Sequence, residues 1–402
     1  MLVVDPIVDR GDRHGRLIFG LITGGSKSVD QAHCRCRVSG TRISSVPSLA
    51  FVSNAADGTV STFSIGDDGT LRRVAVSEIG PGCGSLVIDS ARRLVYVGVK
   101  TDPPSIVTCR IQSDGSLRPM SRRDVDATVH FLGLSPDGGS MVAASYNGGF
   151  GISMPVDGDG VVGEVVSRIE YPNMHACAIA PDGRTAYFVS LGADLVAQCA
   201  LDNHTLTPLD PPTAPAPRGS GPRHLALTRD GGHVYVMTEF SGAVLHYTRD
   251  RDGTLHLAGQ AAAFAPDRGL GHSRFGADPT AEHLIWGADL HLSGDARFCW
   301  GSERTESTLA TVHVDADGTP RDATVFTPTE LQPRGFAVSP DGRYLLCAGE
   351  RSTTVSLFEI LPDGSLTLRD RAETGSGALW VRFLEPSEDD ESISSAVRSR
   401  TD

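Results

Sequence analysis

The chain has 402 residues, of which 40% are hydrophobic and 21% charged, which is typical of a soluble globular protein. Its formal net charge of −13 argues against nucleic-acid binding, which needs a basic surface, but not against a small anion held by a few local arginines. The eight cysteines show no disulfide pattern, and the longest apolar run near the start is too short to span a membrane. We therefore expect a cytoplasmic protein without membrane attachment.

Residues 1–43 match none of the repeats that follow, and we predict an N-terminal extension outside the folded domain, compatible with disorder. Its segment HCRC (33–36) has the residue types of metal ligands. No second pair follows at the spacing of a zinc site, so the sequence predicts no metal and no other cofactor.

From about residue 44 onward the chain repeats with a period of about 45 residues, marked by two kinds of turn. Copies of the first turn are SPDGG (135–139), APDGR (180–184), TRDGG (228–232), SGDAR (293–297) and SPDGR (339–343). Copies of the second are DDGTL (67–71), SDGSL (113–117), RDGTL (251–255) and PDGSL (362–366). Turns with Asp and Gly join antiparallel strands because these residues tolerate positive φ.

Short runs rich in Val, Leu, Tyr and Phe lie between the turns and predict about four strands per unit. This pattern predicts an all-β protein, a seven-bladed β-propeller over residues 44–386. The segment GSGALWVRFLEP (375–386) resembles GSGPRHLAL (219–227), so we expect the C-terminal strand to complete the first blade and remove a free edge. An extra stretch at 258–287 is expected to lie over a binding face, and the polar tail 387–402 is expected to be disordered.

The repeat also locates a cluster of charged residues. Seven residues before the Asp of each first turn, at the start of the first strand, the units have Gly84, His130, His175, Arg223, Ala288 and Arg334; the unit of Gly84 is counted from Ala91, which replaces the Asp in a degenerate turn, DSARR (89–93). Nine residues after it, at the end of the second strand, they have Lys100, Tyr146, Leu191, Glu239, Arg304 and Glu350. Both sets should surround one mouth of the central channel. Arginines there can bind a carboxylate or phosphate, and His and Glu can exchange protons.

At these positions the sequence resembles the seven-bladed lactonase family, which includes propeller-type 6-phosphogluconolactonases and fungal carboxymuconate lactonizing enzymes. The resemblance covers roughly residues 48–385 and is carried by MHACAIAPDGR (174–184), the segment from GPRHLAL to VYVMTE (221–239), ADLHLSGDARFCWGSER (288–304) and PRGFAVSPDGRYLL (333–346). It implies that His175, Arg223, Glu239 and Arg304 are the catalytic residues. The family commonly has Asn where this chain has Thr238 and Glu303.

The ring positions His130, Tyr146, Arg334 and Glu350 are our further candidates for substrate binding. A structural alternative exists for each charged group. Arg223 with Glu239 could be an ion pair between strands, Arg304 could pair with Glu303 or Glu306, and Glu350 could pair with Arg334 or Arg304.

Three functions are compatible with this sequence. The first is cofactor-independent hydrolysis of a small anionic sugar lactone such as 6-phosphogluconolactone, with arginines on the anion and His175 or Glu239 as general base. The second is cyclisation of a muconate-type dicarboxylate. The third is a propeller that binds a ligand or a protein without catalysis, since a fold does not imply a reaction. The expected partner is a small lactone or carboxylate, and the expected state is a monomer or a weak homo-oligomer.

Overall fold

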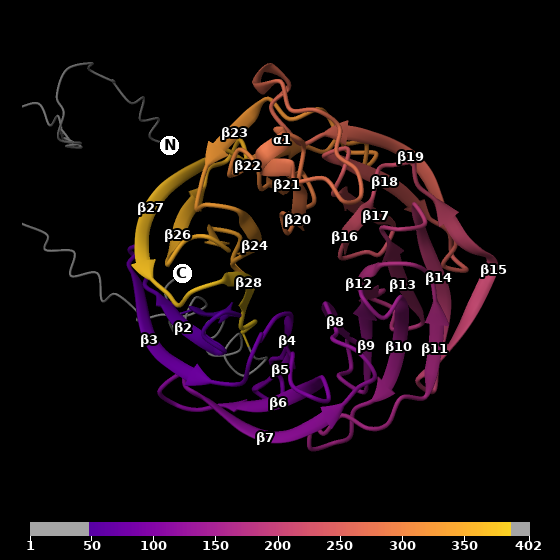
Figure 1. Cartoon of the computed structure of the whole chain (residues 1–402), viewed down its shortest axis with the longest axis vertical. Coiled ribbons are helices and arrows are strands. Elements are labelled where there is room, and N and C mark those ends of the chain that lie inside the picture. The colour runs from indigo at the N-terminus through magenta and orange to yellow at the C-terminus, as the bar shows by residue number, and fades with distance from the viewer. Residues whose placement is uncertain (1–47, 387–402) are drawn as a thin grey trace, which may run out of the picture. The chain divides into compact units, whose positions relative to one another are not determined.

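A computed structural model describes residues 48–386, which form seven four-stranded antiparallel sheets arranged as blades around a central axis (Figure 1). This confirms the predicted all-β, seven-bladed propeller. The predicted extension 1–43 and tail 387–402 lie outside the described residues, and their boundaries stay predictions.

Within each blade the four strands lie side by side, ordered from the central axis outward. The innermost strands are β4 (Leu86–Asp89), β8 (Phe131–Leu134), β12 (Met174–Ile179), β16 (Pro222–Leu227), β20 (Gly287–Leu292), β24 (Pro333–Val338) and β28 (Ala378–Phe383). The second strands are β5 (Leu94–Val99), β9 (Ser140–Ser145), β13 (Thr185–Ser190), β17 (His233–Thr238), β21 (Phe298–Glu303), β25 (Tyr344–Gly349) and β1 (Ser48–Asn54). The third strands are β6 (Ser105–Ile111), β10 (Phe150–Pro155), β14 (Leu195–Asp202), β18 (Ala243–Arg249), β22 (Thr308–His313), β26 (Thr354–Ile360) and β2 (Thr59–Ile65). The outermost are β7 (Leu117–Asp124), β11 (Ser167–Glu170), β15 (Thr205–Pro215), β19 (Leu255–Ala262), β23 (Val325–Pro328), β27 (Leu366–Glu373) and β3 (Leu71–Glu78).

The ring is closed by the two ends of the propeller. The last strand, β28, pairs antiparallel with the first strand, β1, and the sheet has the order β28-β1-β2-β3. Val52 lies opposite Val381 and Ala50 opposite Phe383 in this pairing. The expected closure is thus confirmed, and β28 covers the edge that β1 would otherwise leave open on the central side.

The two recurring turns have the geometry that their sequence predicts. In the first kind, Gly138 has φ of +70°, its N–H donates to Ser135 O at 2.8 Å, and the Asp137 carboxylate accepts the N–H of Gly139 at 2.9 Å. A residue with a Cβ would be strained at such a φ, which explains the recurring Gly. These turns join the first and second strands. We call the end of the ring that carries them the rear, and the opposite end, where the innermost strands begin, the front.

The strands are buried between blades and exposed only at the rim. Every residue of the second strands β5, β13 and β25 is buried, whereas the outermost strand β3 exposes most of its side chains. Six cysteines lie in this core as free thiols, namely Cys83, Cys109, Cys177, Cys199, Cys299 and Cys347. They behave as the small buried hydrophobes that their apolar surroundings predicted. Within residues 48–386 no helix is long and apolar enough to cross a membrane.

Five of the seven innermost strands carry a β-bulge near their front end. The register skips a residue at His175 in β12, at Arg223 in β16 and at Arg334 in β24, and it also shifts in β20 and β28. A bulge puts two residues of one strand opposite one residue of its neighbour, and so redirects a side chain. Four of the predicted ring positions, those of His175, Arg223, Ala288 and Arg334, therefore lie where the regular alternation of the strand is broken.

The inserted segment before β20 begins later in the chain than the sequence predicted. Residues 258–262 belong to the outermost strand β19, because the pairing of β19 with β18 continues as far as Ala262. The segment outside the repeat is therefore 263–286, not 258–287. It contains a 3-10 turn, η1 (Pro266–Arg268), and one helical turn, α1 (Pro279–Glu282). Its end reaches the front of the ring through Trp286, as described next.

Candidate active site

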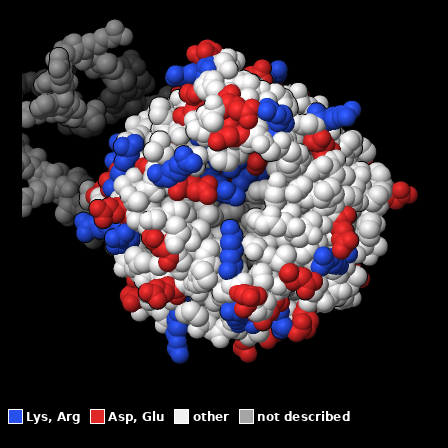
Figure 2. Space-filling view, in the orientation of Figure 1, with Lys and Arg blue, Asp and Glu red and all other residues white. Residues whose placement is uncertain are grey.

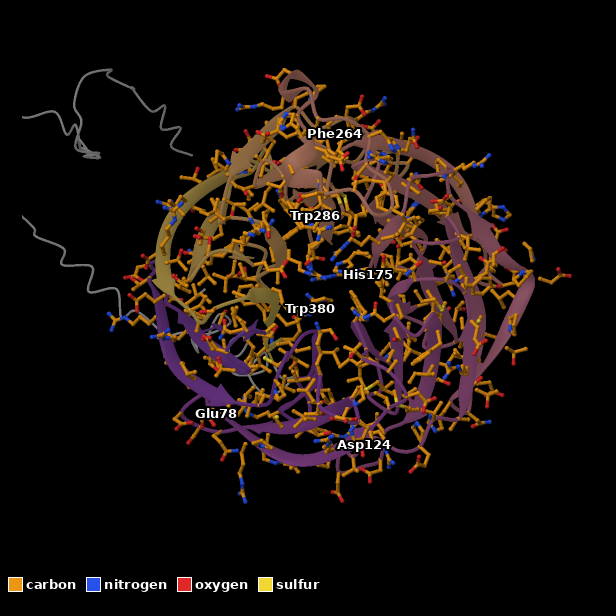
Figure 3. The ribbon with its side chains drawn as sticks, in the orientation of Figure 1. Glu78, Asp124, His175, Phe264, Trp286 and Trp380 are labelled. Carbon is orange, nitrogen blue, oxygen red and sulfur yellow. The ribbon has the colours of Figure 1, made fainter. Side chains whose placement is uncertain are left out.

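The predicted ring residues meet at the front end of the ring. His175, from the innermost strand β12, points toward the centre, and Trp286 and Trp380 lie near it, whereas Glu78 and Asp124 lie at the rim (Figure 3). The strands that carry these residues begin or end at this face because strand one and strand two of a blade are antiparallel. The structure thus brings the two predicted sets together around one mouth.

Glu239 lies between two buried arginines. Its Oε2 accepts a hydrogen bond from Arg223 Nε at 2.7 Å and lies 3.0 Å from Arg304 Nη2. Arg223 also donates to Ala288 O at 2.8 Å, and the two guanidinium side chains are 1% and 2% exposed. Arg304 therefore pairs with Glu239 across two blades rather than with Glu303 or Glu306.

The charges in this triad stabilise one another. Burial lowers the pKa of Arg223 to about 10 and that of Arg304 to about 9, so both stay protonated at neutral pH. Burial would raise the pKa of Glu239, but the positive charges of Arg304 and Arg223 outweigh it and hold the pKa below its ordinary value. Glu239 is consequently an anion that orients two cations, and it is poorly suited to accept a further proton.

Trp286, at the end of the long connection, packs on Arg304, and Glu303, at the end of β21, holds Trp286 in place. The guanidinium carbon of Arg304 lies 3.9 Å from the centre of the Trp286 ring, and its Nη2 donates to Gly287 O at 2.9 Å. Glu303 is fully buried and accepts backbone N–H groups from Trp286 at 2.8 Å, from Thr305 at 3.1 Å and from residue 306 at 2.7 Å. The departure from Asn at this position therefore has a structural use: it fixes the end of the inserted segment.

Three aromatic rings border the mouth on the other side. The ring centres of His130 and Tyr146 are 5.9 Å apart, those of Tyr146 and His175 are 5.8 Å apart, and those of His130 and His175 are 6.3 Å apart. The backbone N–H of Tyr146 donates to His130 Nδ1 at 3.0 Å, which leaves the proton of the neutral ring on Nε2. Burial lowers the pKa of His130 to about 4, and burial with the charge of Arg223 holds that of His175 well below 6.5. Both imidazoles are neutral at physiological pH.

Two cations at the mouth remain accessible to a ligand. Arg334 Nη1 lies 3.2 Å from Glu350 Oε2, with side-chain exposures of 28% and 32%, so the predicted pairing of Glu350 with Arg334 is present. Lys100 is exposed and close enough for its charge to lower the pKa of His130. Counting Arg223 and Arg304, four cations face two carboxylates here, in a protein with a net charge of −13. Figure 2 shows Lys and Arg beside Asp and Glu at the centre of the ring.

A second layer beneath this mouth was missed from sequence. His224, the residue after Arg223, is 1% exposed, and its Nδ1 lies 2.7 Å from Asp289 Oδ1. Its ring packs against Phe131 and Trp380 with centres 5.2 and 5.4 Å away. These aromatic rings come from three innermost strands and close the channel below the mouth. The sequence does contain a signal for this layer, because a polar residue follows the ring position in two blades. His224 follows Arg223 in PRH (222–224), and Asp289 follows Ala288 in ADLH (288–291).

A cavity of about 670 Å³ lies at the rear of the ring and is lined by first-turn residues such as Arg229, Arg297 and Asp341. None of the predicted site residues lines it. Its arginine Arg297 already pairs with Asp295 at 2.6 Å, and both side chains are largely exposed. Glu239 with its two buried arginines lies at the front, together with the unpaired imidazole nitrogens of His175 and His224, and we therefore place the candidate site there. Among residues 48–386 no group of three or more His, Cys, Asp or Glu side chains is arranged to hold a metal ion.

The family model of the seven-bladed β-propeller lactonases matches residues 48–383, and the chain belongs to this family. The 6-phosphogluconolactonase of Serratia proteamaculans (strain 568) is similar to it, with 27% identity over 339 residues that cover 84% of this chain and 98% of that protein. The structure of the periplasmic gluconolactonase of Pseudomonas aeruginosa has a TM-score of 0.75 at 25% identity and covers 84% of this chain and 99% of its own. A protein from Lactobacillus plantarum has the same fold, with a TM-score of 0.75 at 19% identity, covering 85% of this chain and 100% of its own.

Proposed function

We propose that this protein hydrolyses a small phosphorylated sugar lactone, such as 6-phosphogluconolactone, at the front mouth of the propeller and without a cofactor. One observation carries the proposal: four cations and a neutral imidazole, His175, converge on one mouth with only two carboxylates. A surplus of positive charge suits a phosphorylated substrate, and a neutral imidazole suits removal of a proton from water. The names of the two lactonases to which the chain is similar support the same reaction class.

In this mechanism His175 is the general base. Its Nδ1 is buried, whereas Nε2 is not enclosed in the same way and is the nitrogen that can meet a water molecule at the mouth. The water oxygen attacks the lactone carbonyl carbon while His175 takes its proton, and the carbonyl oxygen becomes an oxyanion. Arg223, the neighbouring cation, stabilises that oxyanion. The proton then passes to the ring oxygen as the ester bond breaks.

The other ring residues bind and orient. Arg334 and Lys100, the accessible cations, hold the phosphate, and Glu239 with Arg304 keeps Arg223 in place through the contacts at 2.7 and 3.0 Å. Arg304 is then a positioning residue and not a group that touches the lactone. The six buried free thiols of the described residues fit a reducing compartment, and we propose that the reaction takes place in the cytoplasm.

The test compares 6-phosphogluconolactone with glucono-1,5-lactone, after subtraction of spontaneous ring opening. We expect Arg334→Gln to raise KM for the phosphorylated lactone by about 10- to 100-fold, which is the loss of one charged hydrogen bond, and to leave the neutral lactone unaffected. Arg343→Gln is the matched control, because Arg343 is exposed at the rear turn of the same blade. If the wild type hydrolyses neither lactone above the spontaneous rate, the proposal is wrong.

A further inference from the structure

Beneath the mouth, Asp289 and His224 form a buried pair whose hydrogen bonding can be followed atom by atom. Asp289 is 3% exposed, and its carboxylate accepts backbone N–H groups from Leu290 at 2.9 Å and Phe336 at 3.2 Å, besides the 2.7 Å contact with His224 Nδ1. Burial would raise the pKa of Asp289, but the imidazoles of His291 and His224 outweigh it and hold the pKa well below its ordinary value. Asp289 is therefore an acceptor only, and Nδ1 of His224 carries the proton.

This tautomer leaves His224 Nε2 without a proton. Burial, with the charge of Arg223, lowers the pKa of His224 to about 3, so the ring is neutral and Nε2 can only accept. Nε2 is fully buried and has no hydrogen-bond partner among the described residues. Buried polar atoms are rarely left unpaired, so this acceptor requires an explanation.

His175 has the complementary feature. Its Nδ1 is also buried and unpaired among residues 48–386, and its ring centre lies 5.2 Å from that of His224. The unpaired acceptor Nε2 of His224 and the unpaired Nδ1 of His175 thus lie on adjacent imidazole rings of two neighbouring blades. If His175 carries its proton on Nδ1, that group can donate toward His224 Nε2, directly or through one water molecule. Nε2 of His175 is then the free lone pair at the mouth.

We propose that Asp289, His224 and His175 form a proton relay that ends at the mouth and makes His175 an effective base. The relay rests on the lactone hydrolysis proposed above. When His175 Nε2 takes a proton from the attacking water, His175 Nδ1 releases its proton to His224 Nε2. His175 stays neutral, and the positive charge resides on His224, beside the Asp289 carboxylate. The two protons return in the reverse order when Nε2 of His175 protonates the leaving ring oxygen, so water and lactone give the hydroxy acid.

The surroundings favour this distribution of charge. His175 has no carboxylate within 4.0 Å among the described residues, whereas His224 has Asp289 at 2.7 Å. The charged and titratable groups that face the two rings are Arg223, Arg334, His130, Tyr146, Asp289 and Arg382. Of these only Asp289 is negative. Phe131 and Trp380 pack against His224 and keep bulk solvent from the relay.

The kinetic test uses His224→Gln and Asp289→Asn, with His246→Gln as the matched control. His246 is another buried histidine, but it lies in the third strand β18, where its Nε2 is 2.9 Å from Nδ1 of His233, and it contacts no member of the relay. We expect both relay variants to lower kcat by about 10²- to 10³-fold with KM within about threefold of wild type, and the control to retain activity. In mixtures of H2O and D2O, the wild-type kcat should fall with the deuterium fraction along a curve, as expected when two protons move in the same step. The kcat of His224→Gln should fall linearly, as expected when one proton moves. Wild-type kcat in His224→Gln, or a one-proton dependence in the wild type, would overturn the relay.

A second measurement on the full wild-type chain needs no substrate and remains valid if the variants fail to fold. Nitrogen-15 NMR of the imidazoles, with His224 assigned through its ring contacts with Phe131 and Trp380 and His175 through that with Tyr146, should show both histidines protonated on Nδ1. A proton on Nε2 of His224 would overturn the relay whatever the activity. The expected tautomers in a protein that hydrolyses no lactone would instead retain the relay and reject the proposed substrate.

Discussion

Glu239 lies at the mouth, where the sequence placed it, but its contacts indicate a role other than that of a general base. A glutamate beside a histidine suggests a general base. In the structure, however, its carboxylate binds Arg223 and Arg304 at 2.7 and 3.0 Å and is only 18% exposed. A carboxylate held by two guanidinium groups is stabilised as the anion and loses basicity. We therefore assign proton transfer to His175 and electrostatic positioning to Glu239.

This role predicts a pH-dependent stability. Glu239→Gln should lower the free energy of unfolding at neutral pH by about 3 kcal/mol, because two buried guanidinium groups lose their carboxylate. The folded pKa of Glu239 is depressed, so its contribution is complete above the ordinary value of 4.5 and is lost as the pH falls below 4.5 through the folded pKa. Thermal denaturation should therefore show a Tm difference between wild type and variant that is full at neutral pH and shrinks in acid.

The control for this prediction is Glu350→Gln. Glu350 contacts one arginine, Arg334, and both side chains are about one third exposed, so the same substitution should cost only about 0–1 kcal/mol. Equal Tm values for Glu239→Gln and Glu350→Gln at neutral pH would contradict the role of Glu239 as the buried partner of two cations.

The site residues that the sequence revealed are those to which the repeat applies. His175, Arg223, Glu239 and Arg304 occupy equivalent positions of different blades, so a fixed offset from each turn finds them. Trp286 lies in the inserted segment, where no repeat provides a reference. His224 and Asp289 were missed for a different reason. In a regular strand the residue after a channel-facing one points the other way, and only the bulges in β16 and β20 remove that alternation.

At the scale of elements, the bulges and the inserted segment adapt a standard blade to the site. Five innermost strands shift register at the front, while their rear halves pair regularly. The regular part, with its Asp-Gly turns and alternating burial, is set by local sequence and could be predicted. The bulges depend on contacts between blades, such as Arg223 with Ala288 O, which sequence periodicity does not contain.

The inserted segment supplies a prediction at this scale. Glu303→Ala should leave three partly buried backbone N–H groups without their acceptor and cost about 2–4 kcal/mol of stability. It should also release Trp286 from Arg304. Trp286 is the only partly exposed one of the three tryptophans, since Trp300 and Trp380 are buried, so acrylamide quenching of fluorescence reports on it selectively.

We expect stronger quenching of Glu303→Ala than of the wild type. Glu306→Ala is the matched control, because the Glu306 side chain is partly exposed and lies 3.8 Å from His283. That variant should be quenched like the wild type. Unchanged quenching of Glu303→Ala, with the fold intact, would show that Glu303 does not hold the segment in place.

At the scale of the whole molecule, the ring shares its stability among blades, and β28 has a special position in it. This strand contributes Trp380, Val381 and Phe383 to the core, and Trp380 Nε1 donates to Leu86 O at 3.1 Å in the next blade. Burial of each large side chain contributes about 1.5–3 kcal/mol, so the three together reach the order of the net stability of a typical domain, about 5–15 kcal/mol. Closure was predictable from sequence because the last segment resembles the first strand of an internal unit.

The last prediction concerns the boundaries of the domain. A chain of residues 44–377 lacks β28, exposes the edge of β1 and loses the Trp380 contacts, so it should show no cooperative thermal transition and should aggregate in size-exclusion chromatography. A chain of residues 44–386 keeps every described strand and should melt within a few degrees of the full chain, as about 1 kcal/mol or less of lost stability allows. A markedly lower Tm for the second chain would contradict the predicted boundaries, because residues 1–43 or 387–402 would then stabilise the propeller. Cooperative melting of the first chain would show that the ring does not depend on closure by its C-terminal strand.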